Sequence, residues 1–103
     1  MEYRLENYSR NPQMLLDRMA QNCRARRLEK GYSRKTLADL TGIPAPTLER
    51  FERTGKISLE AFCQIVIQFD YFDEMAALLN HTKYSTSQEL ETINKNQNRK
   101  NGR

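Results

Sequence analysis

Residues 33–52 read SRKTLADLTGIPAPTLERFE, and two short helical patterns meet in this segment. Ser33 is a favourable N-cap residue, which predicts a helix over 34–40. Gly42 lies in the Thr-Gly-Ile interruption that follows and adopts a positive φ at little cost, so we expect a tight turn there. A second helix is expected over about 45–52, because the prolines at its start fall in the first turn, where missing N–H groups cost little. Two short helices joined by a three-residue turn form a helix-turn-helix.

Apolar side chains recur at helical spacing on both helices and predict how they pack. Ala38 is small where the two helices are expected to cross, and Ile43 and Leu48 are expected to fill the angle between them. The predicted inward positions are Leu37, Ala38 and Leu40 on the first helix and Leu48 and Phe51 on the second.

Three further helical patterns surround this motif. Asn11 and Pro12 predict the start of a long helix that ends at about Glu29, before a glycine. Ser58 predicts the start of another helix and Asp73 the start of a fifth. The inward positions expected on these helices are Leu16, Met19, Cys23 and Arg27, then Leu59, Phe62, Cys63, Val66 and Phe69, and finally Met75, Ala76, Leu78 and Leu79. No strand pattern competes, so the predicted fold class is all-α.

The patterns also predict how the chain is organised. Residues 1–11 are expected to form an N-terminal arm, and residues 12–80 a helical domain that contains the helix-turn-helix. Residues 81–93 are expected to form a loop with a short helix from Ser85 to Ile93. Residues 94–103 hold four Asn, four basic residues and no large apolar side chain, which predicts a disordered basic tail.

The charge of the chain is unevenly distributed. The whole sequence has 17 basic and 13 acidic residues, a net charge of +4 and a pI of about 9.3. Residues 18–56 carry +6, residues 57–93 carry −5, and residues 94–103 carry +4. A basic centre with an acidic flank indicates a polyanionic partner on one face.

Several functional classes find no support in the sequence. No apolar run approaches the ~18 residues of a membrane-spanning helix, and the N-terminal residues lack the apolar core of a signal peptide. Cys23 and Cys63 are too few for a zinc site and are interpreted as reduced core thiols, while His81 is interpreted as a loop residue. No Cys/His pair, phosphate loop or spaced carboxylate pair indicates catalysis. We therefore expect a cytoplasmic protein that is not an enzyme and uses no metal or cofactor.

The helix-turn-helix segment carries a recognisable residue pattern. It reads Gly31-x-Ser33-Arg34-x-x-Leu37-Ala38, then Thr41-Gly42-Ile43, then Thr47-Leu48-x-Arg50-Phe51-Glu52. This pattern closely resembles the helix-turn-helix of the Cro/phage-repressor (XRE) family, and the resemblance extends over about residues 19–79. It implies a compact five-helix, lambda-repressor-like domain that binds DNA, usually as a dimer. It also implies a structural ion pair between Arg27 and Glu52, because an Arg on the first helix pairs in that family with the Glu that ends the third.

The resemblance places the second helix of the motif in the major groove, where base edges are distinguishable. Arg50 is the candidate for bidentate contact with guanine, whereas Glu49 either accepts from cytosine or pairs with Arg50 or Arg53. The family's frequent Gln-rich start is replaced by Ala45-Pro46, so readout there is expected to be apolar or by shape. The expected base contacts are Ala45, Pro46, Thr47, Glu49 and Arg50, and the expected phosphate contacts are Arg34, Lys35, Arg53 and Lys56.

These features predict a sequence-specific transcriptional regulator that binds a partly palindromic double-stranded operator as a homodimer, most simply as a repressor or autorepressor. The second half of the chain reads Phe51-Glu52, then Ser58-Leu59-Glu-Ala-Phe62-x-x-Ile65, then Asp73-Glu-Met-Ala-Ala-Leu-Leu79, followed by the basic tail. This half resembles HipB-type antitoxins of toxin-antitoxin operons, which bind DNA and hold a HipA-type kinase inactive. Two alternatives stay open: a stand-alone phage-type repressor, and a protein-interaction module with no DNA binding. Tyr71, Phe72 and Met75 are interpreted either as core or as the dimer or partner surface.

Overall fold

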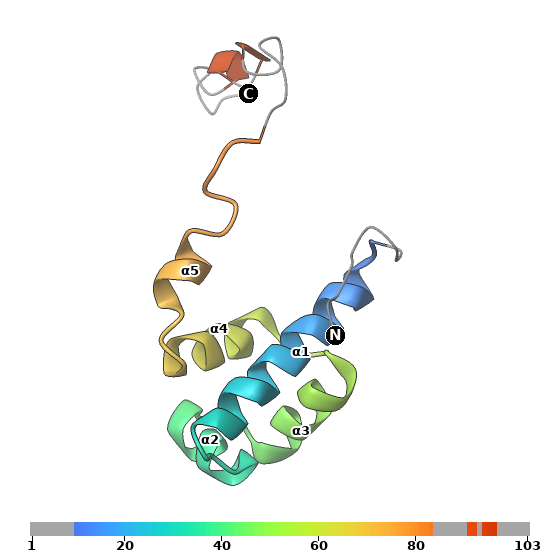
Figure 1. The fold of residues 1–103 in the computed structure, drawn as a ribbon, viewed down its shortest axis with the longest axis vertical. Coiled ribbons are helices and arrows are strands. Elements are labelled where there is room, and N and C mark those ends of the chain that lie inside the picture. The colour runs from blue at the N-terminus through green and yellow to red at the C-terminus, as the bar shows by residue number, and fades with distance from the viewer. Residues whose placement is uncertain (1–9, 84–90, 93, 97–103) are drawn as a thin grey trace. The chain divides into compact units, whose positions relative to one another are not determined.

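The computed structural model describes residues 10–83, 91–92 and 94–96, and all regular structure among them is helical. The chain divides into two units, residues 1–72 and 73–103. Most of the predicted N-terminal arm lies outside the described residues. The labelled helices are α1 (Pro12–Glu29), α2 (Arg34–Thr41), α3 (Ala45–Thr54), α4 (Leu59–Gln68) and α5 (Phe72–Ala76) (Figure 1).

Local capping explains where three of these helices begin. The Asn11 Oδ1 atom accepts the Met14 N–H at 3.0 Å at the start of α1. The hydroxyl oxygens of Ser33 and Ser58 accept the N–H groups three residues ahead, at 3.0 Å and 3.1 Å, at the starts of α2 and α4. Because each cap satisfies a backbone donor that has no helical partner, the predicted starts of these helices are confirmed.

Left-handed glycines end the two helices of the helix-turn-helix. Gly42 has φ 80° and its N–H donates to the Ala38 carbonyl at 2.8 Å, which closes α2. Gly55 has φ 81° and its N–H donates to the Phe51 carbonyl at 2.7 Å, which closes α3. The third helix is therefore two residues longer than predicted, because the helical backbone continues up to the glycine.

Residues from four helices form the core of the first unit. α1 packs against α3, and α2 packs against both α3 and α4. Figure 1 shows α3 beside α1, with α2 at the carboxyl end of α1. The buried apolar residues are Ala20, Leu37, Ile43, Leu48, Phe51, Ile65, Val66 and Phe69. Ile43 and Leu48 therefore fill the angle between α2 and α3 as predicted.

Four leucines expected on inward faces are exposed instead, two in the first unit and two, Leu78 and Leu79, in the second, where Ala76 is exposed as well. Leu40 on α2 and Leu59 on α4 both point to solvent, and Leu59 is 70% exposed. Each leucine lies three residues from another predicted inward position, Leu40 from Leu37 and Leu59 from Phe62. A residue at this spacing can fall at the border of the inward face of a helix. Only the neighbouring helices decide on which side of that border the residue lies.

The second unit differs from the prediction at two points. α5 ends at Ala76 instead of near Leu79, since residues 77–79 form turns and Leu79 has φ 67°, outside the right-handed helical region. Residues 91–92 and 94–96 are helical, so the prediction of disorder is wrong for 94–96. The remainder of the predicted helix and tail, residues 84–90, 93 and 97–103, lies outside the described residues.

We predict that Gly55→Ala destabilises the protein more than Gly42→Ala. A Cβ atom on Gly55 lies 2.8 Å from Leu16 Cβ and 2.9 Å from its carbonyl carbon, whereas one on Gly42 has nothing within 4 Å. Both substitutions strain a positive φ, which costs about 1 kcal/mol. Gly55→Ala adds about 1–3 kcal/mol of overpacking between α1 and the α3–α4 loop. Urea unfolding measures both variants, and equal losses would contradict the close approach at Leu16.

Candidate nucleic-acid interface

The third helix has one buried face and one exposed face. Leu48 and Phe51 each retain 1% exposure and hold α3 against the core. The face turned to solvent carries Pro46, Glu49, Arg50 and Arg53. The two other residues predicted to contact bases, Ala45 and Thr47, are partly buried at the borders of this exposed face. We call Pro46, Glu49, Arg50 and Arg53 the outer face of α3.

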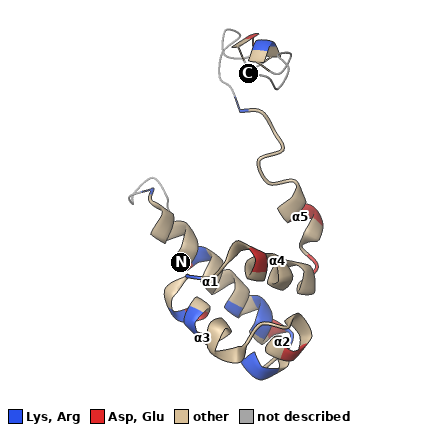
Figure 2. Cartoon of the chain, turned by 180° about the vertical axis from the view of Figure 1, so that it is seen from behind, with Lys and Arg blue, Asp and Glu red and all other residues tan. Residues whose placement is uncertain are grey.

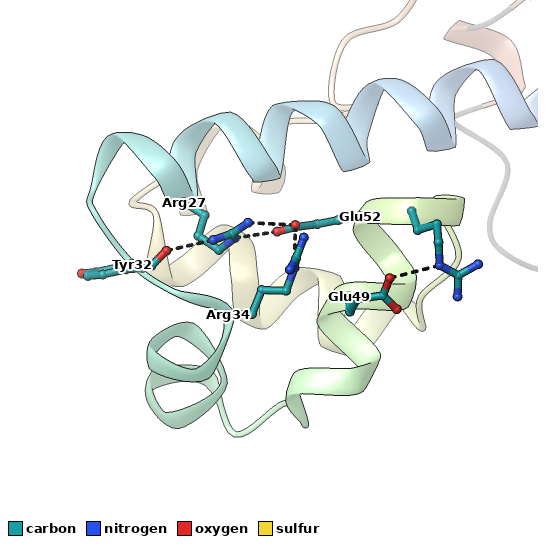
Figure 3. A network of polar contacts seen from close by, with 6 residues as sticks. Arg27, Tyr32, Arg34, Glu49 and Glu52 are labelled. Atoms are coloured by element: carbon teal, nitrogen blue, oxygen red, sulfur yellow. Dashed lines mark hydrogen bonds and ion pairs between the residues drawn. The ribbon is translucent and has the colours of Figure 1, made fainter.

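A buried ion pair joins α1 to α3 behind this surface (Figure 3). The Arg27 Nε donates to Glu52 Oε2 at 2.7 Å, and a terminal Arg27 nitrogen donates to Oε1 at 3.0 Å. The other terminal nitrogen of Arg27 donates to the Tyr32 carbonyl oxygen at 2.9 Å. The two side chains are only 6% and 5% exposed. The ion pair that the family resemblance implies is therefore present, and its bidentate geometry offsets the cost of burying both charges.

A second arginine binds the same carboxylate. The Arg34 Nε, at the first position of α2, donates to Glu52 Oε1 at 3.0 Å. Figure 3 shows Arg27 and Arg34 converging on Glu52. Sequence reasoning assigned Arg34 only to a DNA phosphate and missed this partner, since the contact joins residues eighteen apart and no local pattern marks it.

The two arginines set the ionisation of Glu52. Burial by itself raises the pKa of the Glu52 carboxyl, but hydrogen bonds and charge attraction from Arg27, and then from Arg34, outweigh burial. The pKa therefore lies below its ordinary value of 4.5, and Glu52 is ionised at neutral pH.

The remaining residues predicted to contact DNA differ in their hydrogen bonds and ion pairs within the protein. Arg53 Nε donates to Glu49 Oε2 at 3.1 Å in an exposed ion pair on α3. Of the partners that the sequence allowed for Glu49, the structure therefore shows Arg53. Lys35 Nζ lies 3.5 Å from Asp39 Oδ2, and Lys56 Nζ donates to Gln13 Oε1 at 3.3 Å. The Arg50 side chain is exposed and makes no hydrogen bond or ion pair with any residue that the structure describes. Arg50 is thus the outer-face cation available to an external acceptor.

The structure refines where the positive charge lies. Figure 2 shows basic residues along α1, α2 and α3 and an acidic residue on α4. Residues 18–30 of α1 and its end hold five basic residues and one acidic residue, whereas residues 33–54 hold four basic and three acidic residues. Most of the positive charge predicted for the central segment therefore belongs to α1, and α2 and α3 are nearly balanced.

The predicted apolar surface is divided between the two units. Tyr71 and Phe72 are exposed at the end of the first unit, and Met75 is partly buried in the second. Tyr71 is held beside α4, because its N–H donates to the Val66 carbonyl at 2.9 Å. Tyr71 and Phe72 thus belong to the solvent-facing surface of the first unit.

The described residues contain no group of three His, Cys, Asp or Glu side chains that could hold a metal ion. Among the helices in the described ranges, none combines the length and the apolar character needed to cross a membrane.

Burial, with the nearby charge of Glu52 adding to it, raises the pKa of the Cys23 thiol to about 12. Cys23 therefore stays a neutral thiol at physiological pH.

Comparison of the chain with protein-family models, with curated proteins and with solved structures finds no match in any of the three.

We predict that Glu52→Gln lowers the free energy of unfolding by about 3 kcal/mol, because it leaves the buried Arg27 guanidinium without a counter-charge. The matched control is Glu49→Gln, which removes a carboxylate from the same helix. The Arg53 and Glu49 side chains are 63% and 47% exposed, so this change costs less than about 0.5 kcal/mol. Urea unfolding at pH 7 gives both values, and a wild-type stability in Glu52→Gln would refute a structural role for the pair.

Acid should remove the stabilisation that the ionised Glu52 carboxylate provides. Because folding lowers the pKa of Glu52 below 4.5, its stabilisation is fully present above that value and is lost as pH falls through the folded pKa. We expect the stability of the wild type to fall more steeply below pH 4.5 than that of Glu52→Gln, so the two curves converge in acid. Unfolding curves recorded from pH 7 to pH 2 test this, and parallel curves would contradict it.

Proposed function

We propose that the chain is a sequence-specific DNA-binding transcriptional regulator of the Cro/phage-repressor type, which places α3 in the major groove of an operator. The observation that carries the proposal is the outer face of α3 with its exposed Arg50. An α-helix fits the width of the major groove, and a guanidinium reads guanine there through two parallel hydrogen bonds. The resemblance of residues 19–79 to that family supports the same orientation.

The polar groups around α3 suit a DNA backbone. Arg34 and Lys35 lie in the first turn of α2, and Lys56 lies in the loop after α3. The partners of Lys35 and Lys56 are exposed, so exchanging them for phosphate costs little. Glu52 binds Arg34 through Nε, and the terminal amino groups of Arg34 donate to no described residue. Arg34 can therefore keep its internal bond and still meet a phosphate.

Base readout in this proposal is concentrated at the centre of α3. Pro46 offers no hydrogen-bonding side chain, and Arg53 and Glu49 neutralise each other on the surface. Arg50 supplies the direct hydrogen-bonding contact, while the start of the helix contributes apolar contact and shape. A single strong contact in each half-site favours a dimer on two half-sites about 34–36 Å apart, because each subunit alone reads few bases. Occupation of such a site blocks a promoter and represses transcription.

The test begins with selection and sequencing of DNA fragments bound by the full chain. Gel shifts at two salt concentrations then compare the selected site with unrelated DNA. Preferential binding to the selected site supports the proposal. Failure to enrich any sequence, with no binding even at low salt, would sink it and would leave the protein-interaction module as the function.

We predict different effects for two kinds of substitution. Arg50→Ala weakens binding to the selected site by about 1–3 kcal/mol and relaxes one base position. Arg50→Lys keeps the charge but loses the bidentate geometry, so it relaxes the same base position with an unchanged salt dependence. Lys35→Ala weakens binding to all DNA sequences alike and lowers the slope of log affinity against log salt concentration by about one. Titrations on selected and single-base-substituted sites measure these effects, and unchanged base preference in Arg50→Ala would exclude α3 as the reading helix.

A further inference from the structure

The side chain of Gln13, in the first turn of α1, joins this helix to the loop that follows α3. Its Nε2 atom donates to Asp17 Oδ1 at 2.8 Å and to the Thr54 carbonyl oxygen at 2.9 Å. Its Oε1 atom accepts from Lys56 Nζ at 3.3 Å. The Asp17 carboxylate and the Thr54 carbonyl only accept, whereas the Lys56 ammonium only donates. The three partners therefore fix the orientation of the Gln13 amide.

The loop that receives these bonds is held closely on α1. The Gly55 backbone lies so near this helix that a Cβ atom there would be 2.9 Å from the carbonyl carbon of Leu16. The Thr54 hydroxyl oxygen accepts the Lys56 N–H at 3.1 Å. The Thr54 carbonyl belongs to the last turn of α3, where carbonyls lack helical partners, and Gln13 satisfies it. The backbone that carries Lys56 is thus fixed, and Gln13 also holds the far end of its side chain.

We propose that Gln13 is a positioning residue for DNA binding, which holds the Lys56 ammonium and the loop after α3 in the geometry that meets a DNA phosphate. This inference rests on the proposed function and deepens it. Gln13 lies outside residues 19–79, which carry the family resemblance, and no motif in the sequence links it to DNA.

Lys56 need not give up Gln13 to bind a phosphate. An ammonium has three N–H donors, and Lys56 Nζ makes one hydrogen bond with the residues that the structure describes. Gln13 is a neutral acceptor, so it restricts the ammonium without cancelling its charge, whereas Lys35 is paired with the Asp39 carboxylate. Ordering a free lysine side chain on binding costs conformational entropy. Gln13 lowers that cost because it restricts Lys56 before DNA binds.

The same loop is tied to the turn of α3 that carries Arg50. The Thr54 hydroxyl donates to the Arg50 carbonyl oxygen at 2.7 Å, and the Gly55 N–H donates to the Phe51 carbonyl oxygen at 2.7 Å. Phosphate contacts set the register of a protein on the duplex, whereas base contacts read the sequence. A Lys56 held at a fixed place relative to α3 therefore helps to set the register in which Arg50 meets a base.

The first experiment is a double-mutant cycle on DNA affinity, with Gln13→Ala, Lys56→Ala and both substitutions in the full chain. Titrations on an unrelated duplex isolate the phosphate contacts. Gln13→Ala is expected to weaken binding about threefold to tenfold, which corresponds to ordering one long side chain. It is expected to have no further effect in Lys56→Ala, because Gln13 acts through that ammonium. The matched control is Gln21→Ala, since Gln21 is an exposed glutamine of α1 without a hydrogen bond to any described residue.

The outcomes separate the positioning role from the proposed function. Affinity in Gln13→Ala equal to that in Gln21→Ala overturns the positioning role and leaves DNA binding standing. An equal loss from Gln13→Ala with and without Lys56 does the same, because it indicates a general effect on the fold. A wild-type chain that binds no DNA overturns both.

A second variant separates positioning from stability. Gln13→Glu removes the donors to Asp17 and Thr54 and places a negative charge beside Lys56. A carboxylate in the first turn of a helix is favourable, which offsets its repulsion of Asp17, so urea unfolding is expected to show near wild-type stability. The new carboxylate neutralises the Lys56 ammonium. DNA binding is therefore expected to weaken at least as much as in Gln13→Ala, and the slope of log affinity against log salt concentration is expected to fall by about one. Wild-type affinity and salt slope in Gln13→Glu overturn the proposal.

Discussion

The carboxylate of Glu52 holds the helix-turn-helix in place, because three helices depend on it. Arg27 brings a guanidinium from α1 into the protein interior, where an unpaired charge would be strongly destabilising. Glu52 on α3 supplies the counter-charge, and Arg34 attaches the start of α2 to the same group. The rotation of α3 about its axis follows from this contact together with Leu48 and Phe51. That rotation determines which residues form its outer face.

The outer face of α3 is better suited to selective contacts than to strong electrostatic attraction of a polyanion. On α2 and α3 most cations have internal partners, and Arg50 is the side chain on the outer face of α3 that has none among the described residues. The larger positive charge belongs to α1, which packs behind α3. In the proposed function, the general attraction to a polyanion and the reading of bases therefore come from different helices. A small protein can separate these tasks because phosphate attraction acts over several ångströms, whereas base recognition needs direct contact.

Much of the fold was predictable because its signals are local. Asn11, Ser33 and Ser58 start helices through hydrogen bonds to residues three positions ahead, and these starts were confirmed. Inward faces were predicted less well, since Leu40 and Leu59 have suitable spacing but lie in solvent. The end of α5 was also wrong, because an apolar pattern by itself does not sustain a helix. The candidate site follows the same division. The inward residues Leu48 and Phe51 of α3 were predicted correctly, and the predicted contact residues Pro46, Glu49, Arg50 and Arg53 are exposed, but Ala45 and Thr47 are partly buried.

The sequence alone determined the helix starts, the glycine-closed turn and the pairing partners that a family resemblance can indicate. Hydrogen bonds within a few residues act in any context, and so their effects can be read from the chain. The tertiary structure decided that Arg34 shares Glu52, that Glu49 binds Arg53, and that Ala45 and Thr47 lie at the borders of the outer face. It also left Leu59 and Ile67 of α4 exposed. These outcomes depend on how helices pack across long sequence separations, and many side-chain arrangements are compatible with the same helical pattern until that packing selects one.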